Sequence, residues 1–169
     1  EKNVWDVRKI PGAKYTQNKA LYLLSFEGIP LPFRPLAKRY LKVRVGIRSY
    51  TQCATDLMAL RLFLCFIHKQ YPHWKDLKSL SRKDIENYLA WYRSYTEGWR
   101  KQHYEYLVSL RSFLDYIQRA GYPEAPEKPH FLLLFKEDFP RLAKRSEEDI
   151  KFIPEGVLRQ LEENLDQLT

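Results

Sequence analysis

Two long stretches of the chain repeat apolar residues at helical spacing, and this pattern constrains the fold more than any other feature. Apolar side chains recur at steps of three and four residues between positions 47 and 71, and again between positions 99 and 120. Pro72 ends the first stretch, and Gly121 followed by Pro123 ends the second. The stripes consist of Ile47, Tyr50, Ala54, Leu57, Leu60, Leu64 and Ile67, and of His103, Leu107, Leu110, Leu114 and Ile117. The sequence therefore predicts two long amphipathic helices.

Two shorter helices are predicted beside them. Pro35 can occupy the first turn of a helix that runs to about Val45, because its missing N–H is not needed there. Ser81 and Asp84 form a capping-box pattern ahead of an apolar stripe that runs to about Tyr95. We therefore expect an all-α unit of four helices over residues 35–121.

The flanking segments differ from this helical unit. Residues 4–7 and 22–26 are rich in β-forming side chains and predict one or two short strands, which could pair as a hairpin. The prolines between positions 122 and 130 indicate a linker, and a last amphipathic helix starts at Pro154. We divide the chain into an N-terminal extension (1–33), a helical domain (34–122), a linker (123–152) and a final helical segment (153–169).

The net charge of +8 points to a polyanionic partner. The basic excess lies in the first 120 residues, whereas residues 121–169 are net acidic. This asymmetry favours nucleic acid over a membrane as the partner. No apolar run approaches the roughly 18 residues of a membrane span. No secretory signal opens the chain, so we expect a cytoplasmic protein. Because the chain begins at Glu1 and Met58 is its only methionine, we expect it to be part of a longer protein.

Enzyme and metal signatures were sought and not found. Cys53 and Cys65 on one helix would lie about 18 Å apart along the axis, too far for a disulfide or a shared metal ion. Cys65, His68 and His73 have zinc-like spacing, but Pro72 separates His73 from the helix and no fourth ligand is near. No glycine-rich phosphate loop or nucleophile elbow occurs. We therefore expect no catalytic residue, metal ion or cofactor in this chain.

Basic and polar side chains gather where the two long helices begin. A helix start presents unpaired N–H groups and a partial positive charge, which suit a phosphate. Arginine and lysine add charge, and Ser, Thr, Gln and Tyr add the shorter donors typical of contacts with a DNA backbone. The candidates are Lys42, Arg44, Arg48, Ser49, Tyr50, Thr51 and Gln52, and Arg100, Lys101, Gln102, His103 and Tyr106. The alternative is that these basic groups are simply solvated, with Trp99 as a hydrophobic staple.

Three motifs follow one another in an order that is itself informative. The first is Ser49-Tyr50-Thr51 leading into Leu57, Leu60, Phe63 and Phe66. The second runs from Leu80 to Leu89 and contains Asp84-Ile85 and Tyr88-Leu89. The third is Leu107-Val108-Ser109-Leu110-Arg111-Ser112-Phe113 with a Gly121-Tyr122 exit. With this order, residues 36–121 resemble the N-terminal core-binding, SAM-like domain of tyrosine recombinases, the phage-integrase family.

The segments on either side are similar to the transposon-encoded transposase branch of that family. They are Leu36-Ala37-Lys38-Arg39-Tyr40-Leu41 and the segment from Ile153 to Leu161, which looks like the first helix of the catalytic domain. One position departs from the family pattern, because Gln102 stands where a threonine is usual. The departure concerns that single contact, and the rest of the surface is unaffected.

The resemblance implies a fold, an activity and partners. The fold would be two crossed helical hairpins that form one face of a C-shaped clamp on DNA. The activity would be cutting and rejoining through a 3′-phosphotyrosine, without metal or ATP. Its arginine, lysine, His-x-x-Arg box and tyrosine nucleophile would lie beyond this chain, in a catalytic domain that starts at 153–169. The partners would be double-stranded DNA at a recombination or transposon-end core site, and other recombinase protomers in a synaptic complex.

Other functions fit the same residues. The chain could be a DNA-independent protein-interaction module whose basic front half meets an acidic protein, or a small regulatory factor complete in itself. The extension could be a further DNA-contacting arm, given Arg8, Lys9, Lys14 and Lys19, or a flap for protomer contacts.

Overall fold

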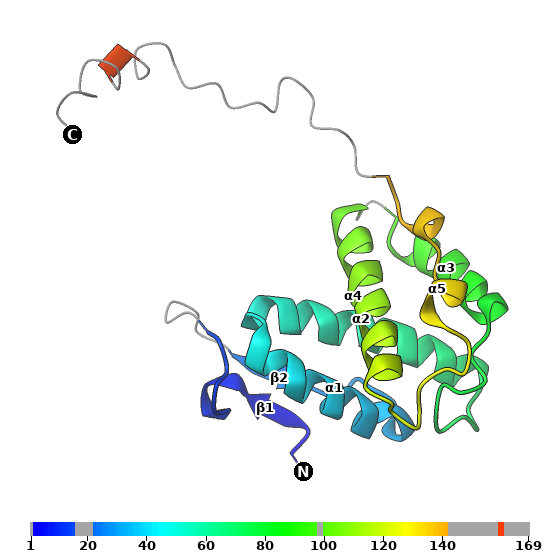
Figure 1. Ribbon diagram of the computed structural model, residues 1–169, viewed down its shortest axis with the longest axis horizontal. Coiled ribbons are helices and arrows are strands. Elements are labelled where there is room, and N and C mark those ends of the chain that lie inside the picture. Colours follow the sequence, from blue (N-terminus) through cyan, green and yellow to red (C-terminus); the bar gives the residue numbers. More distant parts are fainter. Residues whose placement is uncertain (1, 16–21, 98–99, 142–158, 161–169) are drawn as a thin grey trace.

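Four helices form the body of the protein in the computed structural model, which describes residues 2–15, 22–97, 100–141 and 159–160 (Figure 1). They are α1 (Arg34–Ile47), α2 (Tyr50–Gln70), α3 (Arg82–Tyr95) and α4 (Arg100–Arg119). The shorter elements are β1 (Val4–Asp6), η1 (Val7–Lys9), β2 (Leu23–Ser25), η2 (Leu31–Phe33), α5 (His130–Leu133) and η3 (Lys136–Asp138). The expected mostly helical fold with a short β-structured extension is thereby confirmed.

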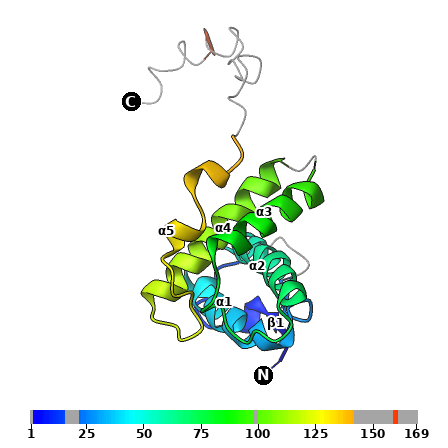
Figure 2. The same cartoon turned by 90° about the vertical axis from the view of Figure 1, so that its right-hand side faces the viewer.

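Helix α2 is the central element, because α1, α3 and α4 all pack on it. Its apolar side chains, among them Phe63, Leu64 and Ile67, are buried in one continuous core. Among the described helices, α2 alone has the length and composition of a membrane span. Since its apolar side chains are buried in the core of the same bundle, the helix is the core helix of a globular fold. Figure 2 shows α2 inside the bundle, next to the helices that pack on it.

The predicted helix boundaries are set by local hydrogen bonds. Ser49 caps α2, because its Oγ accepts a hydrogen bond from the Gln52 N–H at 3.3 Å. Ser81 and Asp84 form the predicted capping box at the start of α3. Gly121 follows α4 with a φ of 67°, the left-handed conformation that glycine adopts without a steric penalty.

The N-terminal extension packs on the bundle and shares its core. Strands β1 and β2 pair antiparallel with Trp5 opposite Leu24. The Trp5 and Phe26 rings meet at 4.6 Å, and Leu24 and Phe26 are buried in the core. The extension is therefore held to the helices by apolar contacts as well as by backbone pairing.

Residues 122–139, which we call the strap, lie against the bundle. The sequence analysis placed them at the start of a linker, but Leu133 and Leu134 are buried in the core next to α3 and α4. Backbone hydrogen bonds join Leu77 N–H to Glu124 O at 2.9 Å and Glu127 N–H to Lys78 O at 3.2 Å. The described part of the predicted linker is thus a packed element. The rest of that linker and the last predicted helix, apart from 159–160, lie outside the described residues.

Candidate nucleic-acid interface

Helices α2 and α4 meet at a buried hydrogen bond, which Ser109 Oγ donates to Asp56 Oδ1 at 2.7 Å. Asp56 lies six positions after the first residue of α2, and Ser109 lies nine positions after the first residue of α4. At about 1.5 Å per residue, the helix starts lie about 9 Å and about 14 Å from this contact along their axes. The two starts are therefore within about 25 Å of each other, less than eight base pairs of duplex at about 3.4 Å each.

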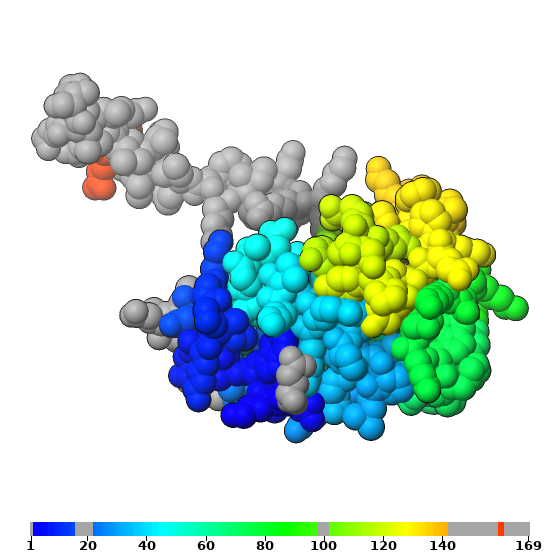
Figure 3. Space-filling model, turned by 60° about the horizontal axis from the view of Figure 1, so that its bottom comes forward, coloured from blue at the N-terminus to red at the C-terminus, as the bar shows by residue number. Residues whose placement is uncertain are grey.

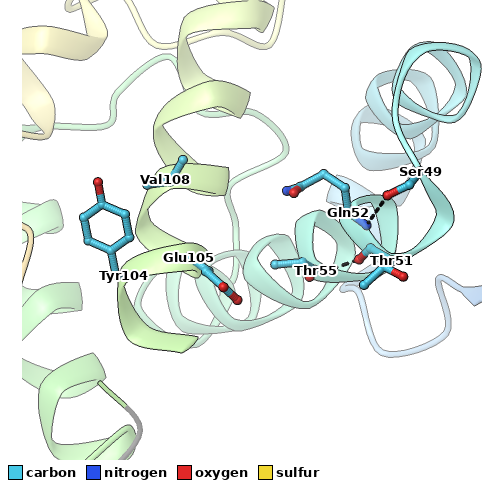
Figure 4. Close-up of a pocket in the computed structure, with 7 residues that line it drawn as sticks. All are labelled: Ser49, Thr51, Gln52, Thr55, Tyr104, Glu105 and Val108. Atoms are coloured by element: carbon cyan, nitrogen blue, oxygen red, sulfur yellow. Dashed lines mark hydrogen bonds between the residues drawn. The ribbon is translucent and has the colours of Figure 1, made fainter. Parts of the chain in front are cut away.

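An open groove lies between the beginning of α2 and the second turn of α4 (Figure 4). Its volume is about 270 Å³. Its lining residues are Ser49, Thr51, Gln52 and Thr55 from α2, and Tyr104, Glu105 and Val108 from α4. The two helices predicted to contact DNA thus share one surface, and most of the residues that line it have a polar group.

Arg44 takes part in a buried network and does not extend into solvent. Its Nε donates to Asp56 Oδ2 at 2.8 Å, and the Arg44 and Asp56 side chains are only 12% and 1% exposed. Gln52 Nε2 donates to the other oxygen of Asp56 at 3.1 Å. With Ser109, these side chains join α1, α2 and α4. Burial would lower the pKa of the Arg44 guanidinium, but its hydrogen bond to Asp56 raises that pKa overall, so the group stays charged.

The other candidates near the start of α2 differ in exposure: four are exposed and one is half-buried. Arg48, Ser49 and Thr51 are exposed, as is Lys42, which lies on α1 beside η1. Tyr50 is half-buried, and its hydroxyl donates to Leu23 O at 3.1 Å. Tyr50 therefore fastens β2 to the bundle.

The remaining candidates lie in the first two turns of α4. Arg100 and Lys101 belong to the helix, but their side chains lie outside what the structure describes. Gln102 is exposed, whereas His103 is 8% exposed and Tyr106 is half-buried beside the core. The pKa of Tyr106 is raised, first of all by burial. Of the α4 candidates whose side chains the structure describes, Gln102 is the exposed one.

His103 joins α3 to α4. The Thr96 hydroxyl donates its one hydrogen to Tyr92 O at 2.7 Å, so at the 2.9 Å contact with His103 Nδ1 the ring nitrogen is the donor. Nε2 is then a buried acceptor, with no hydrogen-bond partner among the described residues. Burial, followed by the charge of Arg93, lowers the pKa of the imidazole. We therefore assign His103 a structural role at neutral pH.

Two features of this region were missed by sequence reasoning. Asp56 and Ser109 are polar residues inside helices with apolar stripes. Such residues can be identified as a buried hydrogen-bonded pair only when the packing of α2 against α4 is known. Lys14 of the extension pairs with Ser49 in an isolated parallel β-bridge, so the extension reaches the start of α2. No local pattern indicates that pairing.

The described parts of the chain hold no cluster of three histidine, cysteine or acidic side chains that could bind a metal ion. Cys53 is a buried free thiol. Cys65 is an exposed free thiol, and its Sγ lies 3.2 Å from Gly28 O.

Among known proteins, the chain is similar to transposases. It is 28% identical over 172 residues to transposase B from transposon PsiTn554 of Staphylococcus aureus. It is 27% identical over the same length to transposase B from transposon Tn554 of S. aureus strains Mu50 and N315. These matches cover 99% of this chain and 26% of each relative, so the chain spans about a quarter of the length of the curated relatives it matches. No family model matches the chain, and no solved structure matches it.

Proposed function

We propose that this chain binds duplex DNA at the end of a mobile element, through the starts of α2 and α4. The observation that carries the proposal is the shared surface: both starts lie within about 25 Å of each other, on the arms of one helix crossing. The net charge of +8 and the similarity to transposase B support DNA as the ligand.

Each helix start has a defined part in this proposal. On α2, Arg48 and the exposed Ser49 and Thr51 contact backbone phosphates. On α4, Arg100 and Lys101 supply charge, and Gln102 can pair with an adenine edge in the major groove. Arg44 is left out of the phosphate contacts, because its guanidinium is paired with the buried Asp56 and only 12% of its side chain is exposed.

Glu105 limits where the DNA backbone lies. It is exposed and lines the groove between the two helices, so a phosphate placed directly in the groove would meet a carboxylate. We therefore place the phosphates at the two rims, where Arg48 and the first turn of α4 stand. A carboxylate is also an acceptor for a cytosine amino group, which suits Glu105 to a base edge.

The finer proposal is that the DNA-binding chain belongs to a tyrosine recombinase. The motif order over residues 36–121 supports it, and the fold has the four helices that such a core-binding domain requires. In that case the strand cutting, the 3′-phosphotyrosine and the contacts between protomers in a synaptic complex belong to the longer protein. This chain supplies recognition and orientation.

Fluorescence anisotropy with a labelled 30-base-pair duplex tests the DNA proposal. We expect Arg100→Glu with Lys101→Glu to weaken binding at least 10-fold, since reversing two phosphate contacts exchanges attraction for repulsion. The matched control reverses Lys69 and Lys75, which are exposed near the far end of α2, about 30 Å from its start. Equal affinities of the two variants would refute the proposed interface.

A protein-interaction role is the second candidate, and one observation favours it. The strap exposes Phe131, Leu132 and Phe135, which are 62%, 50% and 38% accessible. Apolar side chains gathered in this way are typical of contact surfaces. If protein contact is the main function, Phe131→Asp with Leu132→Asp abolishes partner binding in a nuclease-treated pull-down, and the charge reversal at Arg100 and Lys101 has no effect.

A further inference from the structure

The first described segment of the N-terminal extension, residues 2–15, ends beside the proposed DNA surface. Lys14 pairs through its backbone with Ser49, the residue that caps α2. Paired backbones lie about 4.8 Å apart, so Lys14 is a direct neighbour of Ser49 and Arg48. Figure 3 shows the blue surface of the extension against the cyan surface where α2 begins.

Three tyrosines hold the extension in this position. The Tyr15 and Tyr22 rings are 5.5 Å apart, and the Tyr22 and Tyr50 rings meet edge-on at 5.3 Å. Tyr22 is 2% exposed, so the middle ring of the series is buried. The Tyr50 hydroxyl adds its hydrogen bond to Leu23 O. The extension is thereby fastened to the start of α2 at two places: Lys14 pairs with Ser49, and Leu23 accepts the hydrogen bond from Tyr50.

The basic groups of the extension are not equivalent. Arg8 is paired with Asp6 at 2.8 Å, and its guanidinium lies 5.9 Å from the centre of the Tyr22 ring. Lys9 lines a different groove, together with Lys2 and Lys42. Lys14 is exposed, as are its neighbours Tyr15 and Arg48. Of the described cations of the extension, Lys14 is the one that the bridge places at the start of α2.

We infer that the extension is part of the DNA interface, and that Lys14 binds a backbone phosphate next to the one bound at Arg48 and Ser49. This inference rests on the proposed function. It decides between the two roles that the sequence left open for the extension, a DNA-contacting arm and a flap for protomer contacts. The tyrosine series positions Lys14, and the lysine itself makes the contact.

The experiment compares salt dependence among three forms of the 169-residue chain: wild type, Lys14→Ala and Lys9→Ala. Binding to the labelled 30-base-pair duplex is measured between 50 and 200 mM salt, and the slope of log Kobs against log salt is taken. Each phosphate contact contributes about −0.9 to this slope. We expect Lys14→Ala to make the slope less negative by about 0.9, and Lys9→Ala to keep the wild-type slope.

The other outcomes are distinct. A wild-type slope near zero would refute the proposed function itself. A steep wild-type slope that is unchanged in Lys14→Ala would overturn the inference and leave the proposed function standing. If Lys14→Ala instead reduced self-association in sedimentation while the slope stayed at its wild-type value, the extension would be a protomer flap, which also overturns the inference.

Discussion

At the scale of single residues, Asp56 organises the proposed interface, although its side chain is buried and out of reach of DNA. Its carboxylate accepts hydrogen bonds from Arg44, Gln52 and Ser109, which belong to three helices. A buried carboxylate is tolerated only when its partners satisfy it, and here both oxygens are engaged. The same contacts fix the crossing of α2 and α4 and thereby the distance between the two helix starts.

Replacing Asp56 by alanine should destabilise the protein strongly. The change leaves the Arg44 charge buried without its partner, which typically costs about 3–5 kcal/mol. Urea denaturation measures the loss. The matched control is Asp115→Ala, which breaks an ion pair with Arg119, whose side chain is 72% exposed, and should cost less than about 1 kcal/mol. A loss below 1 kcal/mol for Asp56→Ala would show that the network is not a structural centre.

His103 should make the stability depend on pH. Because burial lowers its pKa in the folded state, the unfolded chain takes up a proton at a higher pH than the folded chain does. The free energy of unfolding should therefore fall as the pH drops below about 6.5, the ordinary pKa of histidine. Denaturation at pH 7 and pH 5 measures the change.

Two variants separate His103 from the other histidines. His103→Gln should show a smaller decrease between pH 7 and pH 5 than the wild type. His73→Gln, at an exposed position, should retain the wild-type decrease. Identical pH dependence of His103→Gln and the wild type would assign the effect to other groups.

At the scale of elements, the sequence predicted what local chemistry determines. The Ser81 and Asp84 capping box, the Ser49 cap and the Gly121 turn are each set within a few residues, and the structure confirms them. The strap was assigned to a linker because its prolines suggest an extended segment. The contacts that hold the strap are tertiary, since the hydrogen-bonded residues Arg82 and Asp138 are 56 residues apart in the sequence.

The candidate site was predictable to a similar degree. The periodicity located the two helix starts, and their basic residues could be read directly from the sequence. The partner of Arg44 could not be predicted from the sequence, because it depends on how α1 packs against α2. The β-bridge between Lys14 and Ser49 depends in the same way on where the extension lies.

Weakening the Arg82 contacts should release the strap. Arg82 donates to both oxygens of Asp138, at 2.5 and 2.9 Å, and to Leu133 O at 2.9 Å, and it lies over the Phe135 ring at 3.9 Å. Lysine cannot form this two-pronged contact. We expect Arg82→Lys to cost about 1.5–3 kcal/mol and to accelerate amide hydrogen exchange across residues 130–139.

Arg119→Lys is the control for that substitution, since its ion pair with Asp115 lies on an exposed helix surface. It should leave exchange in the strap at the wild-type rate. If the strap exchanged no faster in Arg82→Lys than in Arg119→Lys, apolar burial at Leu133 and Leu134 would be what holds it.

At the scale of the whole molecule, charge and architecture point to the same surface. The basic excess lies in the extension and the helical unit, and the extension, the end of α1 and the start of α2 meet at Lys14, Arg48 and Ser49. The strap packs along α3 and α4, where its Phe139 ring lies 5.8 Å from the Tyr104 ring, and it exposes apolar side chains. The molecule thus presents a basic region and a strap with exposed apolar side chains, which suits a protein that holds DNA while it contacts other protein.

The most direct test of the central claim is the salt dependence of DNA binding for Arg48→Ala, Arg100→Ala and the double variant. If both helix starts contact one duplex, each single change makes the slope of log Kobs against log salt less negative by about 0.9, and the double change by about 1.8, at one protein per site. Slopes equal to the wild type in either single variant would contradict the claim that α2 and α4 bind the duplex together.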